Sequence, residues 1–280
     1  MSISAADVKK LRDQTGAGMM DCKKALTESG GDFDGAIDIL RKKGQKMSAK
    51  RADREAKEGV VIAKTSQNKN NGVVVRLSCE TDFVSKGEAF VALADSFAEL
   101  ALKNLPDSKE DLLKLDVGGM TMAEKIEEQT GVIGEKIELT DYAKIVTAPG
   151  EGQVLPYIHM GNKAAVIVAL NLEGPQYEEH GKNVAMQVAA MKPVALDKDG
   201  VDASIIEKEI EIGKDIARQE GKPEAMLEKI SQGKLNKFFK ENTLLNQMYV
   251  KSTSKETVAA YLQSVHADLT VTDFKHIKLG

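Results

Sequence analysis

The sequence predicts an α+β protein with an N-terminal three-helix module, a duplicated core of small antiparallel sheets with helices, and an inserted helical hairpin. Apolar residues follow a helical period through the first 45 residues and an alternating, strand-like period from residue 59. The strand-like pattern returns near residue 153, which indicates an internal duplication. A chain of 280 residues is long enough for two or three domains.

Residues 1–45 are expected to form the helical module. Ser4 precedes a helix and Asp7 follows three residues later, which is the spacing of a capping box. The glycines at positions 16, 18, 30 and 31 match no phosphate-binding fingerprint and are interpreted as helix terminators. Three short helices bury little surface, so the module is expected to be marginally stable alone and to contact another surface.

The segment that follows the module is strongly basic. Residues 41–57 hold eight Lys or Arg, two acids and one apolar side chain larger than Ala. This composition favours a solvated helix or a mobile linker. An arm that contacts RNA is the alternative.

The first copy of the core is expected to begin with a β-hairpin. Asn71-Gly72 is predicted to form the hairpin turn, because this dipeptide favours tight turns between strands. A helix over residues 88–102 follows the hairpin. A short helical stretch near 107–130 and a closing strand over 136–147 complete this copy.

The second copy repeats this order after a shift of about 93 residues. The shift places Val73–Glu80 on Val166–Glu173 and Phe90–Ala98 on Asn183–Met191. The second closing strand is expected over residues 269–279, after a much longer insertion. The repeated unit is therefore a hairpin, a helix, an insertion and a closing strand.

The long insertion is predicted to contain a helical hairpin. Gly221 would end its first helix and Pro223 would open its second. Ile205, Ile212 and Ile216 share one face of the first helix, which suits either a structural arm or a surface for a partner or a second copy. The expected division of the chain is a helical module (1–45), a linker (46–58), a first core subdomain (59–148), a second core subdomain (149–193 and 241–280) and a helical-hairpin arm (194–240).

Composition and charge exclude several function classes. The net charge of −4 disfavours nucleic acid as the main partner, so no direct nucleic-acid contact is expected. The two cysteines lie far apart, which disfavours a disulfide framework and a zinc site. No signal peptide and no apolar run of 18 residues is found, so we expect a cytoplasmic protein that does not enter a membrane.

The sequence contains few features of known enzyme active sites. The sequence has no P-loop, no dinucleotide-binding glycine motif and no HExxH motif. Cys79 paired with a histidine is conceivable as a nucleophile and base, but a lone cysteine on a strand is more often a core residue. We therefore expect no covalent catalysis and no cofactor.

The stretch TDFV, residues 81–84, has no evident role in the fold. Thr81 or Asp82 could cap the next helix, but Ser85 and Glu88 already have capping-box spacing. Phe83 would lie on a connector, where most phenylalanines fold back onto the core. An exposed Phe beside an acid would instead suit insertion into a pocket of a partner.

Two longer stretches resemble the signatures of one family. KLRDQTGAGMMDCKKAL at 10–26 and CETDFVSK at 79–86 are similar to those of bacterial elongation factor Ts. YIHMG at 157–161 and VAAMKP at 188–193 extend the resemblance over nearly the whole chain. The family fold has an N-terminal module like ubiquitin-associated domains, a duplicated core, and a coiled-coil arm that serves dimerisation in some members.

The resemblance implies a non-enzymatic guanine-nucleotide exchange factor for elongation factor Tu. Thr81, Asp82, Phe83 and Val84 would form a wedge that dislodges the partner's Mg²⁺ and so promotes GDP release. The positions that would contact the partner elsewhere are Met19 and Met20 on the G domain, Ile133 and Gly134 near the wedge, and His159 facing the third domain. Without the resemblance, His159 would be interpreted as a core histidine.

Two other classes of function remain open at this point. Segment 41–57 could belong to an RNA- or ribosome-associated protein. Cys79 could belong to a thiol enzyme. Neither alternative accounts for TDFV together with the duplication. A homodimer formed through residues 194–240 is a further possibility.

Overall fold

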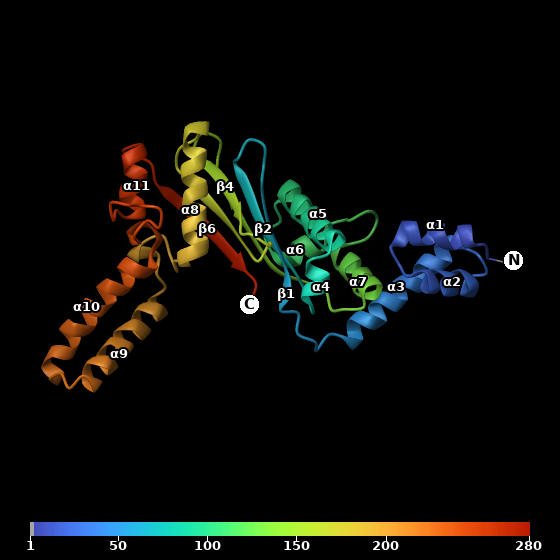
Figure 1. Cartoon of the computed structure of the whole chain (residues 1–280), viewed down its shortest axis with the longest axis horizontal. Coiled ribbons are helices and arrows are strands. Elements are labelled where there is room, and N and C mark those ends of the chain that lie inside the picture. Colours follow the sequence, from blue (N-terminus) through green and yellow to red (C-terminus); the bar gives the residue numbers. More distant parts are fainter. Residues whose placement is uncertain (1–2) are drawn as a thin grey trace.

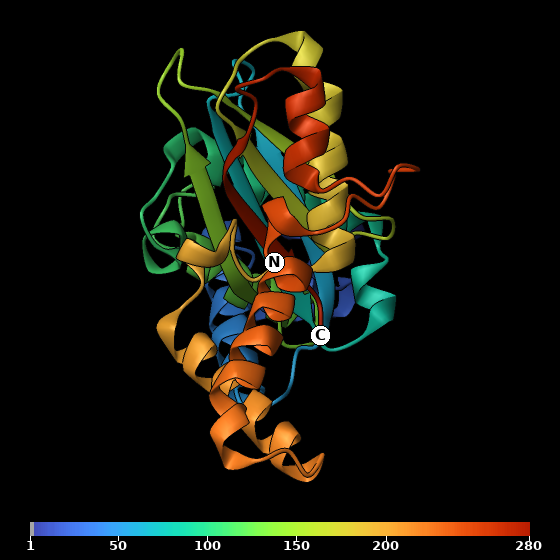
Figure 2. The same ribbon diagram turned by 90° about the vertical axis from the view of Figure 1, so that its left-hand side faces the viewer.

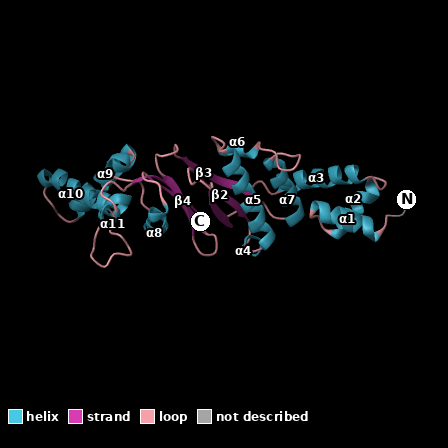
Figure 3. Ribbon diagram, turned by 90° about the horizontal axis from the view of Figure 1, so that it is seen from above, coloured by secondary structure: helices cyan, strands magenta, loops and turns pink. Residues whose placement is uncertain are grey.

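A computed structural model describes residues 3–280 and confirms the predicted α+β class, with helices around two three-stranded antiparallel sheets. The molecule is elongated, with the sheets in the middle, the N-terminal helices at one end and the helical hairpin at the other (Figure 1, Figure 3). Within the described residues, no helix is both long enough and apolar enough to cross a lipid bilayer.

The N-terminal module contains α1 (Ala5–Thr15), α2 (Met19–Glu28) and α3 (Phe33–Lys50). The predicted capping box at the start of α1 is present. Gly16, Gly30 and Gly31 follow helix ends, as expected, with φ of +71°, +68° and +92°. Gly18 is instead the N-cap of α2 with φ of −61°, so its interpretation as a helix terminator is wrong. The buried residues of this small core are Val8, Leu11, Ala17, Cys22, Ala25, Leu26 and Ala36.

Of the two forms expected for the basic segment, its first half is the solvated helix and not the mobile linker, because α3 continues through residue 45 to Lys50 with most of these residues exposed. The second half of α3 packs on α7 (Met122–Ile133). Gly44 and Gly131 meet at this crossing, where a Cβ added at Gly131 would lie 2.6 Å from Gly44 Cα. The boundary predicted at residue 45 thus falls inside a helix, while the division into domains stays a prediction.

The first sheet has the order β1 (Glu58–Thr65), β2 (Asn71–Cys79) and β3 (Glu138–Val146). After β2 the chain forms α4 (Asp82–Ser85), α5 (Glu88–Asn104) and α6 (Lys109–Leu113) before α7. Helix α5 packs on β1 and β2 and supplies two buried phenylalanines to a core shared with α6, α7 and β3.

The predicted Asn71-Gly72 turn is wrong, because both residues belong to β2. The connection is made by residues 66–70, and Lys69 has φ of +59°. Gly72 is instead explained by a close approach to the second sheet, because a Cβ there would lie 2.5 Å from Val154 Cγ1. The dipeptide therefore reflects packing between sheets and not turn chemistry.

The second sheet has the order β4 (Gln153–Ile158), β5 (Ala164–Leu170) and β6 (Val271–Lys278). Helix α8 (Glu178–Met191), preceded by the short turn η1 (Pro175–Tyr177), covers one face of it. Figure 1 shows α5 and α8 on opposite sides of the paired sheets. The predicted hairpin, helix and closing strand of the second copy are confirmed.

Irregular features repeat between the two copies at the predicted spacing. A register shift falls between Arg76 and Leu77 in the first copy, and 93 residues later between Ala169 and Leu170 in the second. Gly59 and Gly152, also 93 residues apart, have φ of +151° and +133°. Shared bulges and shared strained glycines support the inferred duplication.

The two copies pack sheet against sheet, and each hairpin turn reaches the other copy. The Val61 N–H donates to Asn162 O at 2.8 Å, and the Val154 N–H donates to Lys69 O at 2.6 Å. These two bonds join equivalent positions, so the copies are related by a local two-fold symmetry. The turn of the second copy is thereby fixed beside the first copy's edge strand.

The arm consists of α9 (Ala203–Gln219) and α10 (Glu224–Asn242), joined where predicted. It projects from the body below α11 (Val258–Val265) and the short turns η2 (Lys198–Gly200) and η3 (Leu244–Asn246) (Figure 1, Figure 2). The contact between its helices is made by the buried residues Gly213, Ala217, Leu227, Ser231 and Leu235. Ile212 and Ile216 stay 40% and 39% exposed on the adjoining face.

Candidate partner-binding surface

The TDFV stretch forms the one-turn helix α4 and the residue before it, directly after β2. Thr81 occupies the N-cap position, but its side chain makes no capping bond. Instead its hydroxyl donates to Glu135 Oε1 at 2.6 Å, and its N–H donates to Glu135 Oε2 at 3.0 Å. Thr81 is therefore held by another element, at the end of α7.

The capping box predicted at Ser85 and Glu88 is wrong. Helix α5 has Gly87 at its N-cap and no side-chain capping bond. The Ser85 hydroxyl donates to Asp82 O at 3.2 Å, within α4. Because α4 is a separate turn, Ser85 turns towards the core and is buried.

Phe83 points into solvent with 86% of its surface exposed, so the expectation that it folds back onto the core is wrong. The neighbouring Val84 packs on the first core in its place. Successive residues of a helix point about 100° apart, so a single turn cannot direct both apolar side chains inward. The apolar ring is thus presented at the surface next to an acid.

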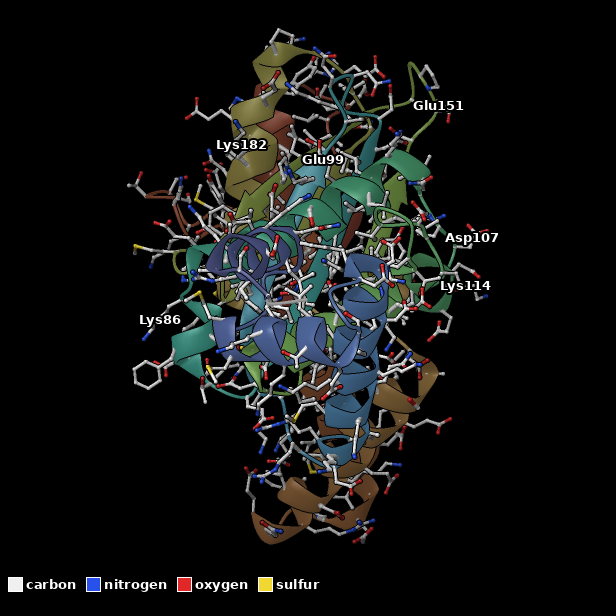
Figure 4. The ribbon with its side chains drawn as sticks, turned by 90° about the vertical axis from the view of Figure 1, so that its right-hand side faces the viewer. Lys86, Glu99, Asp107, Lys114, Glu151 and Lys182 are labelled. Carbon is white, nitrogen blue, oxygen red and sulfur yellow. The ribbon has the colours of Figure 1, made fainter. Side chains whose placement is uncertain are left out.

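Asp82 is partly exposed and accepts a hydrogen bond from Lys86 Nζ at 2.6 Å. The hydrogen bond and the charge of Lys86 lower the pKa of Asp82, so it is a carboxylate at neutral pH. Figure 4 shows Lys86 projecting from the edge of the molecule. A hollow of about 280 Å³ beside α4 is lined by Asp82 and Lys86 and by residues 161–163 of the other copy's turn.

Ile133 and Gly134 lie at the carboxyl end of α7. Gly134 is the C-cap with φ of +81°, and Ile133 packs partly buried on the first core. Ile133 and Gly134 are linked to the wedge by the next residue, Glu135, which bonds Thr81. The sequence did not point to Glu135, although it directly follows the predicted pair.

Met19 and Met20 open α2 and are 56% and 66% exposed. They belong to the N-terminal module, at the end of the molecule remote from the second sheet (Figure 1). Two large apolar side chains on one exposed turn form a second candidate contact, separate from the wedge.

His159 is exposed on the turn between β4 and β5, so the core-histidine interpretation is wrong. Its Nδ1 lies 3.1 Å from the Tyr157 hydroxyl. It lines a groove of about 570 Å³ beside the last turns of α8, together with His276 and the three lysines Lys163, Lys192 and Lys278. The rest of the lining is Tyr157 together with Ala, Met, Val and Leu residues, and it contains no acid.

His276 has a buried Nε2 without a hydrogen-bond partner. Burial, with Lys278 and Lys192 nearby, lowers its pKa. The equivalent residue of the first copy is Lys144, which donates to Leu105 O at 2.7 Å and to Asp107 Oδ1 at 2.6 Å. In the first copy, the end of the longer helix α5 and the loop after it cover the position next to Lys144. In the second copy, α8 ends earlier and the position next to His276 is part of the open groove.

Cys79 is fully buried, and its thiol donates to Thr81 O at 3.2 Å. Burial, with the nearby charge of Glu135, raises the pKa of Cys79 to about 12. A thiol that stays protonated at neutral pH is a poor nucleophile, which argues against a thiol enzyme. In the part of the chain that the structure describes, no group of three or more side chains is arranged to hold a metal ion.

Comparison with known proteins decides the family, because residues 80–280 match the family described as elongation factor TS. The chain belongs to the elongation factor Ts family. It is 54% identical over 278 residues to elongation factor Ts of Christiangramia forsetii, covering 99% of each chain. It is 55% identical over 281 residues to that of Cytophaga hutchinsonii, covering 100% of this chain and 99% of the relative.

Family membership assigns the chain to translation elongation and protein biosynthesis. The family match begins at Glu80, so it includes α4, Glu135 and the groove. The helices α1–α3 precede this range, but the full-length relatives cover them too. All the predicted site residues lie within the shared length.

Proposed function

We propose that this chain, as a member of the elongation factor Ts family, is a guanine-nucleotide exchange factor for elongation factor Tu, acting in the cytoplasm. It binds the GDP-bound form, dislodges Mg²⁺ and promotes release of GDP, which GTP then replaces. The observation that carries the proposal is the exposure of Phe83, at 86%, on a one-turn helix beside the carboxylate of Asp82. No covalent step is required, so the protein acts as an exchange factor and not as an enzyme.

The proposed wedge acts on the metal of the partner. A GTPase holds GDP through backbone contacts to the phosphates and through Mg²⁺, which neutralises their charge. Mg²⁺ requires near-ideal octahedral coordination, so small displacements of its ligands are costly. Phe83 enters an apolar pocket and displaces the surrounding elements, while Asp82 leaves Lys86 and competes for the hydrogen bonds that orient the metal ligands. GDP without Mg²⁺ then dissociates.

The energies are within reach of such a contact. A thousandfold acceleration of GDP release needs about 4 kcal/mol of barrier reduction. A central aromatic anchor commonly contributes about 2 kcal/mol or more to an interface, and the lost metal contacts supply the rest. Because the coupling is reciprocal, GDP or GTP weakens binding of the exchange factor by the same ratio, so nucleotide rebinding ejects it.

Two further surfaces would hold the partner. Met19 and Met20 are proposed to dock on the G domain, and Ile133 and Gly134 to support the wedge. His159 is proposed to face the third domain. The open groove beside His159 supports this assignment, because its lining of apolar and basic residues suits an apolar protein segment that carries an acid.

We also propose that the arm, residues 194–240, is a surface for self-association. Ile212 and Ile216 remain partly exposed on the face of α9 beside the contact with α10. Replacing both with Glu should convert a dimer to a monomer in sedimentation equilibrium. A monomeric wild-type protein at tens of micromolar would refute the dimer.

The test of the exchange function is release of a fluorescent GDP from elongation factor Tu, followed by stopped flow in excess unlabelled GDP. The purified chain should raise the release rate in a saturable manner. Chelation of Mg²⁺ should accelerate release by itself and reduce the further gain from the factor. An unchanged release rate with excess factor would refute the proposal, and salt-sensitive RNA binding by residues 41–57 would then favour the RNA alternative.

A further inference from the structure

We infer that Glu135 is a positioning residue that holds the Phe83 wedge in the orientation needed for exchange, an inference that rests on the proposed function. Both oxygens of its carboxylate bond one residue, Thr81, at 2.6 Å to the hydroxyl and 3.0 Å to the backbone N. Thr81 is the residue at which the chain leaves β2 and enters α4. The carboxylate thus fixes the point from which the wedge projects.

Few interactions within the wedge itself stabilise its conformation. Helix α4 is four residues long and has no N-terminal side-chain cap. A single isolated turn is unstable in water, because nucleating a helix is costly. The Phe83 ring is 86% exposed and so contributes almost no packing to its own position.

Other side-chain contacts of the wedge are mostly local. The Cys79 thiol donates to Thr81 O, the Ser85 hydroxyl donates to Asp82 O, and Lys86 pairs with Asp82. Each of these bonds joins residues no more than four positions apart in the chain. Apart from packing of Val84 on the core and burial of Ser85, Glu135 makes the side-chain hydrogen bonds that tie the wedge to a distant element.

The attachment is reciprocal. Glu135 accepts from the backbone N–H of Thr81, and Glu80 Oε1 accepts from the backbone N–H of Lys136 at 2.6 Å. Glu80 also pairs with Arg51 at 2.7 Å. Charge-assisted bonds are stronger than neutral ones, so segments 80–81 and 135–136 form a clamp at the base of the wedge.

The second copy holds the same position with a neutral amide instead of a carboxylate. The counterpart of Thr81 is Gly174, which has no hydroxyl; its N–H donates to Gln153 Oε1 at 3.3 Å, and its carbonyl oxygen accepts from Gln153 Nε2 at 3.1 Å. The counterpart of Phe83 is Gln176, a polar residue on the turn η1. The charged, carboxylate form of the clamp therefore occurs in the copy that presents an aromatic ring to solvent.

The test compares pairs of variants in release of fluorescent GDP from elongation factor Tu. Thr81→Val removes the hydroxyl at nearly constant shape, and Glu135→Gln keeps the size while replacing one accepting oxygen with an amide. Each should lower the release rate at saturating factor by roughly 10- to 150-fold, the range expected for losing a hydrogen bond to a charged group. The factor concentration for half-maximal release should change less than about threefold, because the docking surfaces remain.

A matched control isolates the clamp. Glu138→Gln removes a neighbouring negative charge that pairs with Lys136 and does not touch Thr81, so it should leave the rates unchanged. Wild-type rates in Thr81→Val and Glu135→Gln would overturn the inference. A higher factor concentration for half-maximal release, with an unchanged rate at saturation, would also overturn the inference, since that pattern indicates a lost direct contact with the partner.

A readout on the free protein separates positioning from general structure and from the exchange function. A fluorinated phenylalanine placed at position 83 should give a ¹⁹F signal that shifts or broadens in Glu135→Gln, with thermal unfolding little changed. The same signal should remain as in wild type in Glu138→Gln. If wild-type protein fails to accelerate GDP release, the proposed function fails; if Glu135→Gln leaves the ¹⁹F signal unchanged, the clamp fails independently.

Discussion

Replacing Phe83 with Ala is the most direct perturbation of the proposed wedge. The side chain is 86% exposed in the free protein, so its removal should change the free energy of unfolding by no more than about 0.5 kcal/mol. Burial of a phenylalanine is worth about 1.5–3 kcal/mol relative to exposure, and nearly all of this gain is still available to a complex. The substitution should therefore lower the apparent second-order rate of stimulated GDP release by about 10- to 150-fold.

Stopped flow with fluorescent GDP on elongation factor Tu measures this rate over a range of factor concentrations. If the ring acts on the metal site in the transition state, the loss falls on the rate at saturation; if it contributes only affinity, the half-saturating concentration rises. Phe83→Leu should give an intermediate rate because it keeps part of the apolar volume. Gln176→Ala, the matched position of the second copy, should have no effect.

Wild-type release by Phe83→Ala would refute the reasoning. An equal loss in Gln176→Ala would also count against it, because the effect would then not depend on the exposed ring. Urea unfolding of both variants checks that neither result reflects a change in folding.

Three further outcomes follow from the packing. Gly131→Val should lower the free energy of unfolding in urea by about 1–3 kcal/mol through overpacking against Gly44, while Gly233→Ala, which has open space around it, should not destabilise. Burial lowers the pKa of His276 in the folded state, so the unfolded chain takes up a proton near pH 6.5 before the folded chain does. The free energy of unfolding should therefore fall as the pH is lowered from 7.5 to 5.5. His276→Gln should make this fall smaller, measured as the shift of the urea unfolding midpoint with pH. A fall as large as that of the wild type would show that another group causes it. Burial raises the pKa of Cys79 to about 12, so alkylation at pH 8 should be slow in native protein and fast in denaturant by mass spectrometry; fast native labelling would contradict its burial.

Local pattern predicted much of the fold. The capping box at Ser4, the hairpin joint at Gly221 and Pro223, and the repeat spacing of about 93 residues all agree with the structure. Each depends on contacts between residues a few positions apart or on direct comparison of one stretch with another. Such features can be predicted from the sequence because they are set by local backbone geometry and by the spacing of apolar residues.

Local pattern failed where the chain meets itself at long range. Position 72 is a glycine within a strand because Val154 of the other sheet approaches it closely. Helix α3 extends past residue 45 because its second half, at Gly44, packs on α7. The groove near His159 is open because α8 ends earlier than α5 does, a difference visible only against the folded first copy.

The sequence by itself determined the elements, the duplication and the family to which TDFV points. Tertiary structure alone decided that Phe83 faces solvent, that Thr81 is held by Glu135 and that His159 borders a basic groove. Whether a side chain is buried depends on the surfaces that other parts of the chain bring to it. Those surfaces come from residues far away in the sequence, which a local pattern does not encode.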